Sequence, residues 1–342
     1  MLAGVLYGRE QLRVESMPVP RIAEGEVLVR VRAALTCGTD VKVFRRGYHA
    51  RMIVPPAVFG HELAGDIVEM GSGVEGFSIG DRVVSANSAP CGECFYCKRN
   101  LENLCEDLLF NNGAYAEYIR IPSRIVEKNL LHVPAHIAYQ EAALAEPLAC
   151  VLRGWEETHA QAGDSVAIIG LGPIGMMFVC IAKYFGARVI AIGRRWQQLD
   201  RAREMGADEL ICTEETPDLP ERILELTEGR GVDVAFEAVG KPETWEMAVK
   251  LLRRGGTVNF FGGCPSDTKV ALPTALLHYS ELTCKASFHH TPALIRKALE
   301  LIANNAVPAR FFINRTEPLT NLLEVMRHLM SHNGHLKTAI IP

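Results

Sequence analysis

The sequence predicts an α/β protein that combines a β-rich part with a doubly wound parallel sheet. Residues 163–287 alternate strand-like with helix-like segments, which is the pattern that builds such a sheet. A glycine-rich turn at residues 170–175 joins the first of these strands to the helix that follows it. Ahead of this region, residues 5–82 have the pattern of short strands interrupted by Gly and Pro, which indicates a β-rich domain with loops.

Length and composition limit the classes of function. At 342 residues the chain is long enough for two domains, and 48% hydrophobic with 22% charged residues is typical of a globular protein. A formal net charge of −4 gives no excess of positive charge for nucleic acid or an anionic membrane, so small-molecule partners are favoured. The N-terminus has no basic stretch followed by a long apolar one, so we expect no secretory signal and a cytoplasmic protein.

Two short motifs lie beside strand-like runs in the β-rich part: Cys37-Gly-Thr-Asp40 and Gly60-His61-Glu62. The clearest of these runs is residues 26–32, where apolar and polar residues alternate. Taken singly, Cys37 would more often be a small buried hydrophobe, and His61 a hydrogen-bonded core histidine. Taken together, a thiol and an imidazole are candidate ligands for one metal ion.

Four cysteines follow in one short lobe with the spacing C-x2-C-x2-C-x7-C: Cys91, Cys94, Cys97 and Cys105. Four thiolates with turns between them predict a closed, tetrahedral structural zinc site. Free or disulfide-paired thiols are one alternative. An iron–sulfur cluster is another, although the flanks lack the Cys-Pro of a ferredoxin sequence. A nucleic-acid finger would need more basic residues than this lobe has.

Glu146 is a further candidate ligand. The sequence predicts a helix over residues 141–155, and Glu146 stands in it next to Pro147 among alanines and leucines. A carboxylate in such surroundings is costly to bury unless it is paired or coordinated. The alternative is a solvated carboxylate at a helix end.

The glycine-rich turn predicts a dinucleotide site. In a strand-to-helix turn of the form G-x-G-x-x-G, Gly170 would permit the tight bend, Gly172 the approach of a pyrophosphate, and Gly175 close helix packing. Pro173 and Ile174 complete the turn, and the phosphates would lie on the helix N-terminus. Residues 165–182 carry no charge, but the glycines and the proline divide them into two short elements, so we reject a membrane span.

The end of the second strand of the sheet bears on the choice of cofactor. An enzyme of this fold that uses NAD places an Asp or Glu there, about 20 residues beyond the glycines. This chain has Gly193 at that place, followed by Arg194 and Arg195. A glycine leaves room for a 2′-phosphate and guanidinium groups can bind it, so we expect NADP. NAD remains the alternative, because arginine can also stack on adenine.

The remaining elements complete the two parts. Further strands of the sheet are expected at residues 189–192, 209–212, 232–237, 257–262 and 282–286. In the tail we expect helices at residues 293–304 and 319–331, and a last strand at residues 337–341.

Taken in order, these motifs resemble a zinc-dependent medium-chain dehydrogenase, in the branch of polyol (sorbitol-like) and threonine dehydrogenases. Gly80-Asp-Arg-Val83 and Glu146-Pro-Leu148 belong to the same resemblance. It implies a GroES-like catalytic domain formed by residues 1–148 and 289–342, with a structural-zinc lobe at about 88–108. It also implies a Rossmann domain at residues 149–288 that binds the dinucleotide, and a homodimer or homotetramer.

The resemblance implies two zinc ions per chain, and an enzyme that interconverts an alcohol and a ketone. Cys37 and His61 match ligands of the catalytic zinc, while Glu62 and Glu146 match positions that are ligands or near-ligands in this branch. Thr39 matches the hydroxyl that starts the family's proton relay.

This chain departs from the relay pattern. Where the family usually has a histidine three residues after that hydroxyl, this chain has Lys42. A lysine is a poor relay at neutral pH because its usual pKa is about 10.4. His49, or the ribose hydroxyls with water, are alternatives, and Lys42 could instead be a surface residue or a contact to a cofactor phosphate.

Three other functions stay open on the sequence alone. A threonine-type dehydrogenase would use NAD. A zinc-free reductase would not need Cys37, His61, Glu62 and Glu146 together. A non-catalytic, nucleotide-sensing zinc protein would keep the glycine turn and the four-cysteine lobe but lose the catalytic ligands. The number of zinc ions per chain separates the last two from a zinc-dependent dehydrogenase.

Overall fold

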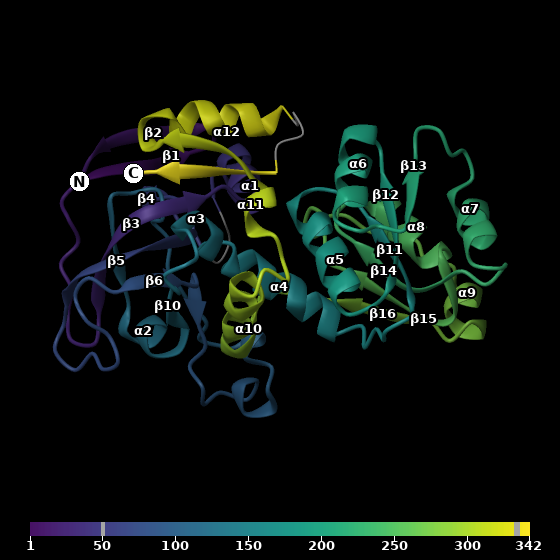
Figure 1. The fold of residues 1–342 in the computed structure, drawn as a ribbon, viewed down its shortest axis with the longest axis horizontal. Helices are drawn as coiled ribbons and strands as arrows, with labels where there is room; N and C mark the ends of the chain where they lie inside the picture. Colours follow the sequence, from purple (N-terminus) through teal and green to yellow (C-terminus); the bar gives the residue numbers. More distant parts are fainter. Residues whose placement is uncertain (49–51, 332–335) are drawn as a thin grey trace. The chain divides into compact units, whose positions relative to one another are not determined.

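The computed structural model describes residues 1–48, 52–331 and 336–342. The chain divides into two compact units, each considered by itself below (Figure 1). The β-rich unit comprises Met1–Ala149 and His290–Pro342, so it contains both ends of the chain. The α/β unit comprises Cys150–His289.

Three sheets form the β-rich unit, and the largest has seven strands. Its order is β10 (Leu130–His132), β6 (Arg82–Ser85), β5 (Glu62–Met70), β3 (Val27–Leu35), β18 (Lys337–Ile341) and β17 (Ile313–Pro318), with β9 (Tyr118–Ile121) also paired to β3. The second sheet has the order β2 (Gln11–Ser16), β1 (Leu2–Gly8) and β4 (Ala57–Val58), and the third pairs β7 (Ser88–Ala89) with β8 (Leu109–Phe110).

The central strand β3 explains how this unit is built. Its apolar side chains Val27, Val29 and Val31 are buried in one core cluster, whereas the alternating Arg30 and Arg32 are exposed. This alternation of apolar and polar residues is what places one face of a strand against a core. The C-terminal strand β18 pairs with β3 beside the segment that leads to Cys37.

Helices complete the β-rich unit. They are α1 (Gly38–Arg46), α2 (Ser123–Asn129), α3 (Tyr139–Ala142), α10 (Pro292–Ala303), α11 (Ala309–Phe312) and α12 (Leu322–Met330), with the 3₁₀ turns η1 (Cys97–Arg99), η2 (Glu102–Leu104) and η3 (Leu319–Asn321). Helix α4 (Ala145–Glu156) begins in this unit.

The α/β unit has one six-stranded sheet whose pairings are all parallel. Its order is β13 (Glu209–Cys212), β12 (Arg188–Gly193), β11 (Ser165–Ile169), β14 (Val232–Glu237), β15 (Leu252–Phe260) and β16 (Thr283–Ala286). Each crossover contains a helix: α5 (Pro173–Tyr184), α6 (Trp196–Glu204), α7 (Leu219–Leu226), α8 (Pro242–Lys250) and α9 (Thr274–Tyr279). The predicted doubly wound parallel sheet is therefore confirmed, and the strand order reverses between β11 and β14, where this fold binds ligands.

Several elements differ from their predicted extents, among them the helix expected over residues 319–331, which is divided into η3 and α12. The helix expected over residues 141–155 is divided into α3 and α4. A proline ring clashes with the carbonyl of the residue four positions earlier, here Ala143, so the helix restarts with Pro147 in the first turn of α4. Strand β15 begins at Leu252, earlier than the predicted residue 257.

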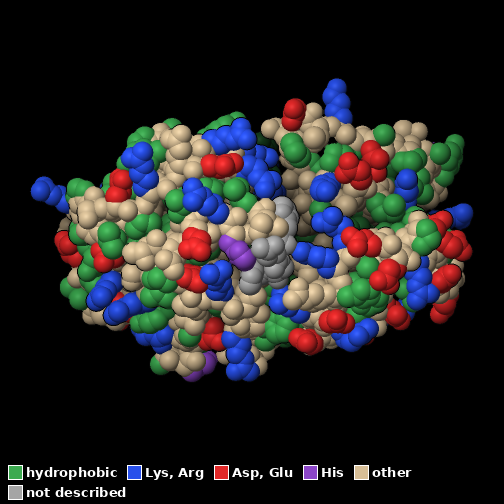
Figure 2. Space-filling view, turned by 90° about the horizontal axis from the view of Figure 1, so that it is seen from above, with side chains coloured by type: hydrophobic (Ala, Val, Ile, Leu, Met, Phe, Trp, Pro, Cys, Tyr) green, Lys and Arg blue, Asp and Glu red, His purple; other side chains and the backbone are tan. Residues whose placement is uncertain are grey.

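The distribution of surface charge and the uncharged residues 165–182 agree with what the sequence predicts, namely no concentration of positive charge and no membrane span. Basic and acidic side chains are interspersed on the face that Figure 2 shows. The uncharged residues 165–182 form β11 and most of α5. Within residues 1–48, 52–331 and 336–342, no helix has the length and apolar character to cross a membrane.

Candidate active site

The structure brings Cys37, His61 and Glu62 together. One ligand atom from each lies within 4.8 Å of the others. Cys37 caps the N-terminus of α1, His61 directly precedes β5, and Glu62 is the first residue of β5. In the antiparallel pairing of β3 with β5, Leu35 lies opposite Glu62, so the ends of both strands deliver these side chains to one place.

Asp40 orients the imidazole of His61. Nδ1 of His61 lies 3.0 Å from Oδ1 of Asp40, and both side chains are buried. When Nδ1 carries the proton and donates to a carboxylate, Nε2 is left to bind a metal ion. Burial alone lowers the pKa of His61, but Asp40 and Cys37 raise it well above its ordinary value. The charges around the ring therefore favour a cation at this place.

Lys337 holds Glu62 from the last strand. Its Nζ donates to both carboxylate oxygens of Glu62, at 2.7 and 2.6 Å, and to the carbonyl oxygen of Thr36 at 3.0 Å. Burial lowers the pKa of Lys337, but Glu62 and then Cys37 raise it above its ordinary value. Sequence reasoning missed Lys337, although a lysine in an otherwise apolar strand is a signal, because lysine is almost never fully buried unless it is paired.

Glu146 lies in the first turn of α4, close to the cluster but not in the tight group of three. Its Oε1 is 3.8 Å from Nε2 of His290, and that nitrogen is 3.4 Å from Oδ1 of Asn87. All three side chains are buried. Burial raises the pKa of Glu146 to about 7, against a lowering effect of His61 and with a raising effect of Glu62. The carboxylate of Glu146 thus interacts electrostatically with the imidazole of His61.

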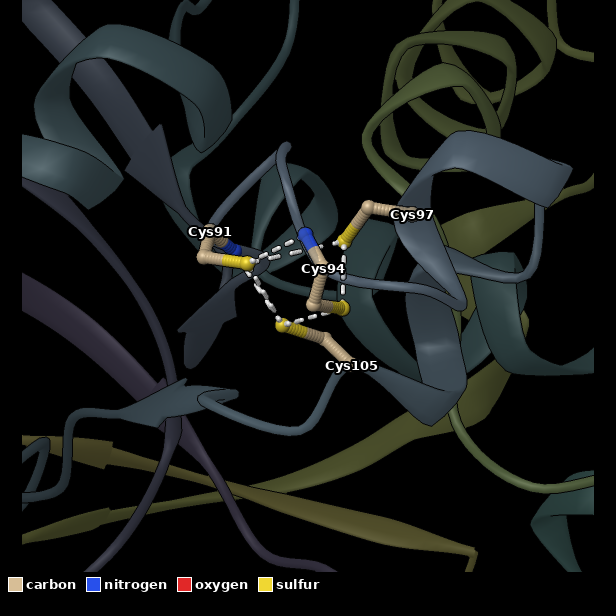
Figure 3. Close-up of side chains that lie close together, drawn as sticks. All are labelled: Cys91, Cys94, Cys97 and Cys105. Atoms are coloured by element: carbon tan, nitrogen blue, oxygen red, sulfur yellow. Dashed lines mark hydrogen bonds between the residues drawn. The ribbon is translucent and has the colours of Figure 1, made fainter.

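The four-cysteine lobe has the geometry of a tetrahedral metal site. Figure 3 shows the four sulfurs pointing toward one another, and four of their separations are 3.4, 3.5, 3.9 and 3.9 Å. Four sulfurs at about 2.3 Å from a tetrahedral zinc ion are about 3.8 Å apart. None of the ten cysteines, all of which lie in the described part of the chain, forms a disulfide. The donor set of Cys91, Cys94, Cys97 and Cys105 therefore fits zinc.

Backbone groups of the lobe support thiolates. The N–H of Cys94 donates to Sγ of Cys91 at 3.4 Å, and the N–H of Cys91 donates to Sγ of Cys105 at 3.2 Å. Backbone hydrogen bonds from Cys97 and Glu106 lower the pKa of Cys94 to about 6. Burial has the opposite effect on Cys97 and raises its pKa to about 12. The lobe thus favours the thiolate form of Cys94, and a bound cation would favour deprotonation of the other three.

The three glycines of the dinucleotide turn meet three different requirements. Gly170 has φ of +94°, in the left-handed region, and a Cβ there would lie 2.5 Å from Cγ2 of Val239. A Cβ at Gly175 would lie 1.8 Å from the carbonyl oxygen of Gly170, so the helix packs too closely for any side chain. Gly172 faces open space at the N-cap of α5, with Pro173 and Ile174 opening the helix. The second position is therefore the one that a phosphate can approach.

The two arginines that follow β12 differ in their contacts. Gly193 is buried, and a Cβ there would meet Cδ1 of Leu171 at 2.9 Å. Arg195 is the N-cap residue of α6, and its Nε lies 3.4 Å from Oε1 of Gln198. Arg194 is exposed, and its guanidinium has no hydrogen-bond or ion-pair partner within the part of the chain that the structure describes. Arg194 is thus available to an anion.

The relay candidates are only partly placed. Thr39 is half-buried in α1, and its backbone N–H donates to Sγ of Cys37 at 3.4 Å. Lys42 is exposed on the same helix. His49 lies outside the described residues.

Comparison with known proteins places both units in one family. Residues 23–134 match the family described as alcohol dehydrogenase GroES-like domain, and residues 173–304 match the family described as zinc-binding dehydrogenase. The chain is 33% identical over 350 residues to a sorbitol dehydrogenase of Bacillus subtilis, with 100% of this chain and 97% of that protein covered. It is 36% identical over 251 residues to an L-threonine 3-dehydrogenase of Bacillus licheniformis, with 72% of this chain and 71% of that protein covered.

The fold is shared with solved structures as well. One from Sinorhizobium meliloti 1021, described as a zinc-binding dehydrogenase bound to NADP, has a TM-score of 0.90 and 30% identity, covering 100% of this chain and 99% of that one. The expected resemblance is therefore confirmed across the whole chain. The chain belongs to the zinc-dependent medium-chain dehydrogenases of the polyol and alcohol type, and it is an oxidoreductase.

Proposed function

We propose that the protein transfers hydride between a secondary alcohol and a nicotinamide cofactor, with a polyol, cyclitol or amino alcohol as substrate. The observation that carries the proposal is the group of the half-buried Cys37 with the buried His61 and Glu62, in which Asp40 lies against Nδ1 of the imidazole. In the oxidation, the hydroxyl proton leaves the alcohol, the carbon-bound hydrogen goes to the nicotinamide as hydride, and a ketone remains. Run backwards, the same site reduces the ketone.

The donor set of this group fits a catalytic zinc ion. A thiolate, an imidazole and one carboxylate leave an open position for the substrate oxygen. When bound there, zinc supplies Lewis acidity that lowers the pKa of the alcohol. The residues of the chain do the rest: Cys37 and His61 hold the ion, and Asp40 keeps Nε2 of His61 directed at it.

The choice between the two carboxylates favours Glu146. Both oxygens of Glu62 already accept hydrogen bonds from Lys337, which keeps that carboxylate in place. We therefore assign Glu146 as the carboxylate that contacts the ion and Glu62 as the charge beside it. Metal-binding side chains are commonly held by such outer partners.

The cofactor is proposed to be NADP, bound with its pyrophosphate on the turn of Gly170, Gly172, Pro173, Ile174 and Gly175. Support comes from the exposed guanidinium of Arg194 beside Gly193, where a 2′-phosphate would lie. The related structure from Sinorhizobium meliloti is described with NADP. A threonine-type reaction with NAD is the second candidate, because the relative from Bacillus licheniformis carries that name.

Proton exit is assigned to the hydroxyl of Thr39 as the first step. Thr39 directly follows the Cys37-Gly38 segment, and its N–H touches Sγ of Cys37. When a nicotinamide cofactor is bound, its ribose hydroxyls with water would offer the next acceptor for the proton, in place of Lys42. Lys42 is exposed on α1, and a lysine ammonium group donates hydrogen bonds but has no acceptor site.

The working form is proposed to be a homo-oligomer. All four residues of β16 are exposed in the single chain, although β16 is the edge strand of a six-stranded sheet. An open edge of this kind can pair with a second copy of itself. Cys284→Glu would add a carboxylate of each copy to such a pairing, and these like charges would oppose it, so sedimentation should show smaller particles for this variant than for the wild type. A monomeric wild type would contradict the assignment.

A substrate panel with a metal count tests the function. Polyols, cyclitols, their phosphates and amino alcohols are supplied with NADP or NAD, and zinc is measured in the same preparation. Turnover of one class of alcohol with two zinc ions per chain is the expected result. One zinc ion without turnover would favour a non-catalytic nucleotide-binding protein, and turnover without zinc would favour a zinc-free reductase.

A further inference from the structure

Tyr115 is a fully buried tyrosine whose hydroxyl reaches the segment that carries Cys37. It lies between β8 and β9 and has 0% exposure. The hydroxyl oxygen is 2.5 Å from Oδ2 of Asp40 and 3.1 Å from the carbonyl oxygen of Leu35. Leu35 and Asp40 stand on either side of Cys37, at the end of β3 and in the first turn of α1. The hydroxyl thus bridges the two ends of the turn that presents the thiol.

The ring of the same tyrosine lies against the other ligand-bearing segment. Gly60 directly precedes His61 and has φ of +89°, and a Cβ at Gly60 would lie 2.7 Å from Cδ2 of Tyr115. The backbone N–H of Tyr115 donates to the carbonyl oxygen of Phe59 at 2.9 Å. One residue therefore contacts the segment before His61 with its ring and backbone, and the Cys37 turn with its hydroxyl.

The carboxylate of Asp40 links the hydroxyl of Tyr115 to the imidazole of His61. Its Oδ1 lies 3.0 Å from Nδ1 of His61, while Oδ2 accepts from the N–H of Cys37 at 3.1 Å and from the hydroxyl of Tyr115. Burial and the charge of Asp40 raise the pKa of Tyr115 well above its ordinary value, so the hydroxyl keeps its proton and donates. A buried carboxylate needs such donors, because leaving it unpaired is costly.

We propose that Tyr115 is a positioning residue that sets the placement of Cys37 relative to His61, acting through Asp40 and Gly60 rather than by contact with a metal ion or substrate. The inference rests on the proposed function, since it concerns the same group of Cys37, His61 and Glu62, called the metal-binding cluster below. An aromatic ring alone would fill this part of the core. The hydroxyl is the part that an apolar core does not require, and its nearest partner is the carboxylate that orients His61.

The variant Tyr115→Phe separates the two parts of the side chain. It keeps the ring against Gly60 and removes only the hydroxyl, and with it the contacts to Asp40 and to the carbonyl oxygen of Leu35. Loss of the direct outer partner of a metal ligand lowers metal affinity by about 10-fold to 100-fold, and because Tyr115 acts one step further out, through Asp40, the low end of that range is expected. We expect zinc to leave the Cys37 cluster of the holoenzyme to a chelator about tenfold more readily, and the four-cysteine lobe to keep its zinc as in the wild type.

A matched control is Tyr139→Phe. The hydroxyl of Tyr139 likewise donates to a carboxylate of the β-rich unit, that of Asp66, but this pair belongs to the contacts of β5 with α3 rather than to the metal-binding cluster. Both variants lose one tyrosine-to-aspartate hydrogen bond, so a general loss of stability affects both. Only Tyr115→Phe should change metal release from the Cys37 cluster.

A spectroscopic measurement adds a readout that core packing does not move. In cobalt-substituted holoenzyme, Tyr115→Phe should shift the ligand-field absorption bands of the Cys37 site, and Tyr139→Phe should leave them unchanged. If Tyr115→Phe retains the wild-type spectrum and metal release, Tyr115 is only a core residue and the inference is wrong. If wild-type protein and Cys37→Ala contain the same number of zinc ions, it is the proposed function that fails.

Discussion

At the scale of single residues, Lys337 and Glu62 form a buried ion pair. The exposed fractions of the two residues are 2% and 0%. Taking charges out of water is costly, and the mutual attraction of a buried pair repays that cost only when geometry and further hydrogen bonds are favourable. Here Nζ also donates to the carbonyl oxygen of Thr36. The pair ties the last strand to the first residue of β5 beside the metal-binding cluster.

Lys337→Met is expected to destabilise the protein by about 3–5 kcal/mol, because it leaves the carboxylate of Glu62 buried without its partner. The double variant Lys337→Met with Glu62→Gln should recover part of this loss, since the uncompensated charge is gone. Denaturant titration of the four proteins measures both effects. A double variant that loses as much as the sum of the single variants would show that the pair is not coupled.

Arg194→Ala should lower kcat/KM for NADP by about 10-fold to 100-fold, because a hydrogen bond to a charged group contributes about 1.5–3 kcal/mol. The value for NAD should change little, since NAD has no 2′-phosphate. Arg203→Ala is the control: Arg203 lies in the last turn of α6, the helix that begins two residues after Arg194, and it pairs with Asp200. A wild-type enzyme that prefers NAD would overturn the assignment of NADP.

At the scale of elements, short structures hold the four-cysteine lobe. Two 3₁₀ turns, η1 and η2, and the strands β7 and β8 supply its regular backbone. Of its thiols, Cys97 and Cys105 are buried and Cys91 and Cys94 are half-buried. Because closed structural zinc sites contribute folding energy, we expect a metal ion held by these four thiols to be a main source of order in the lobe.

Cys94→Ala should therefore lower stability or assembly much more than it lowers turnover by the molecules that remain folded. The thermal midpoint and the zinc content of this variant should both fall, with one zinc ion kept by the Cys37 cluster. Cys264→Ala, at a half-buried cysteine in the loop after β15, is a matched cysteine substitution that should change neither. An unchanged thermal midpoint in Cys94→Ala would argue against a structural metal.

How much the sequence could predict depends on how far apart along the chain the partners are. The glycine turn and the cysteine lobe are local patterns, so spacing alone located them. Asp40 stands in a motif beside Cys37, yet its hydrogen bond to His61 spans 21 positions. Lys337 and Glu62 are 275 positions apart, and only the pairing of β18 with β3 brings them together.

At the scale of the whole molecule, the β-rich unit is assembled from both ends of the chain, and this is what completes the metal-binding cluster. Cys37, His61 and Glu146 come from its first segment, whereas Lys337 and His290 come from its second. The pattern of apolar and polar residues within one segment does not show which distant segment it will pack against. The apolar periodicity of β18 predicted a strand, but not which strand it would join.

The zinc content and the turnover of Cys37→Ala, measured on one folded preparation, test most directly whether Cys37 holds a catalytic metal ion. We expect the wild type to hold two zinc ions per chain and to oxidise its alcohol. Cys37→Ala should hold one zinc ion, keep the thermal midpoint within a few degrees, and lose turnover, because the cluster of Cys37, His61 and Glu62 would lack its thiolate. Full turnover with two zinc ions in the well-folded variant would contradict the central claim that Cys37 holds the catalytic metal.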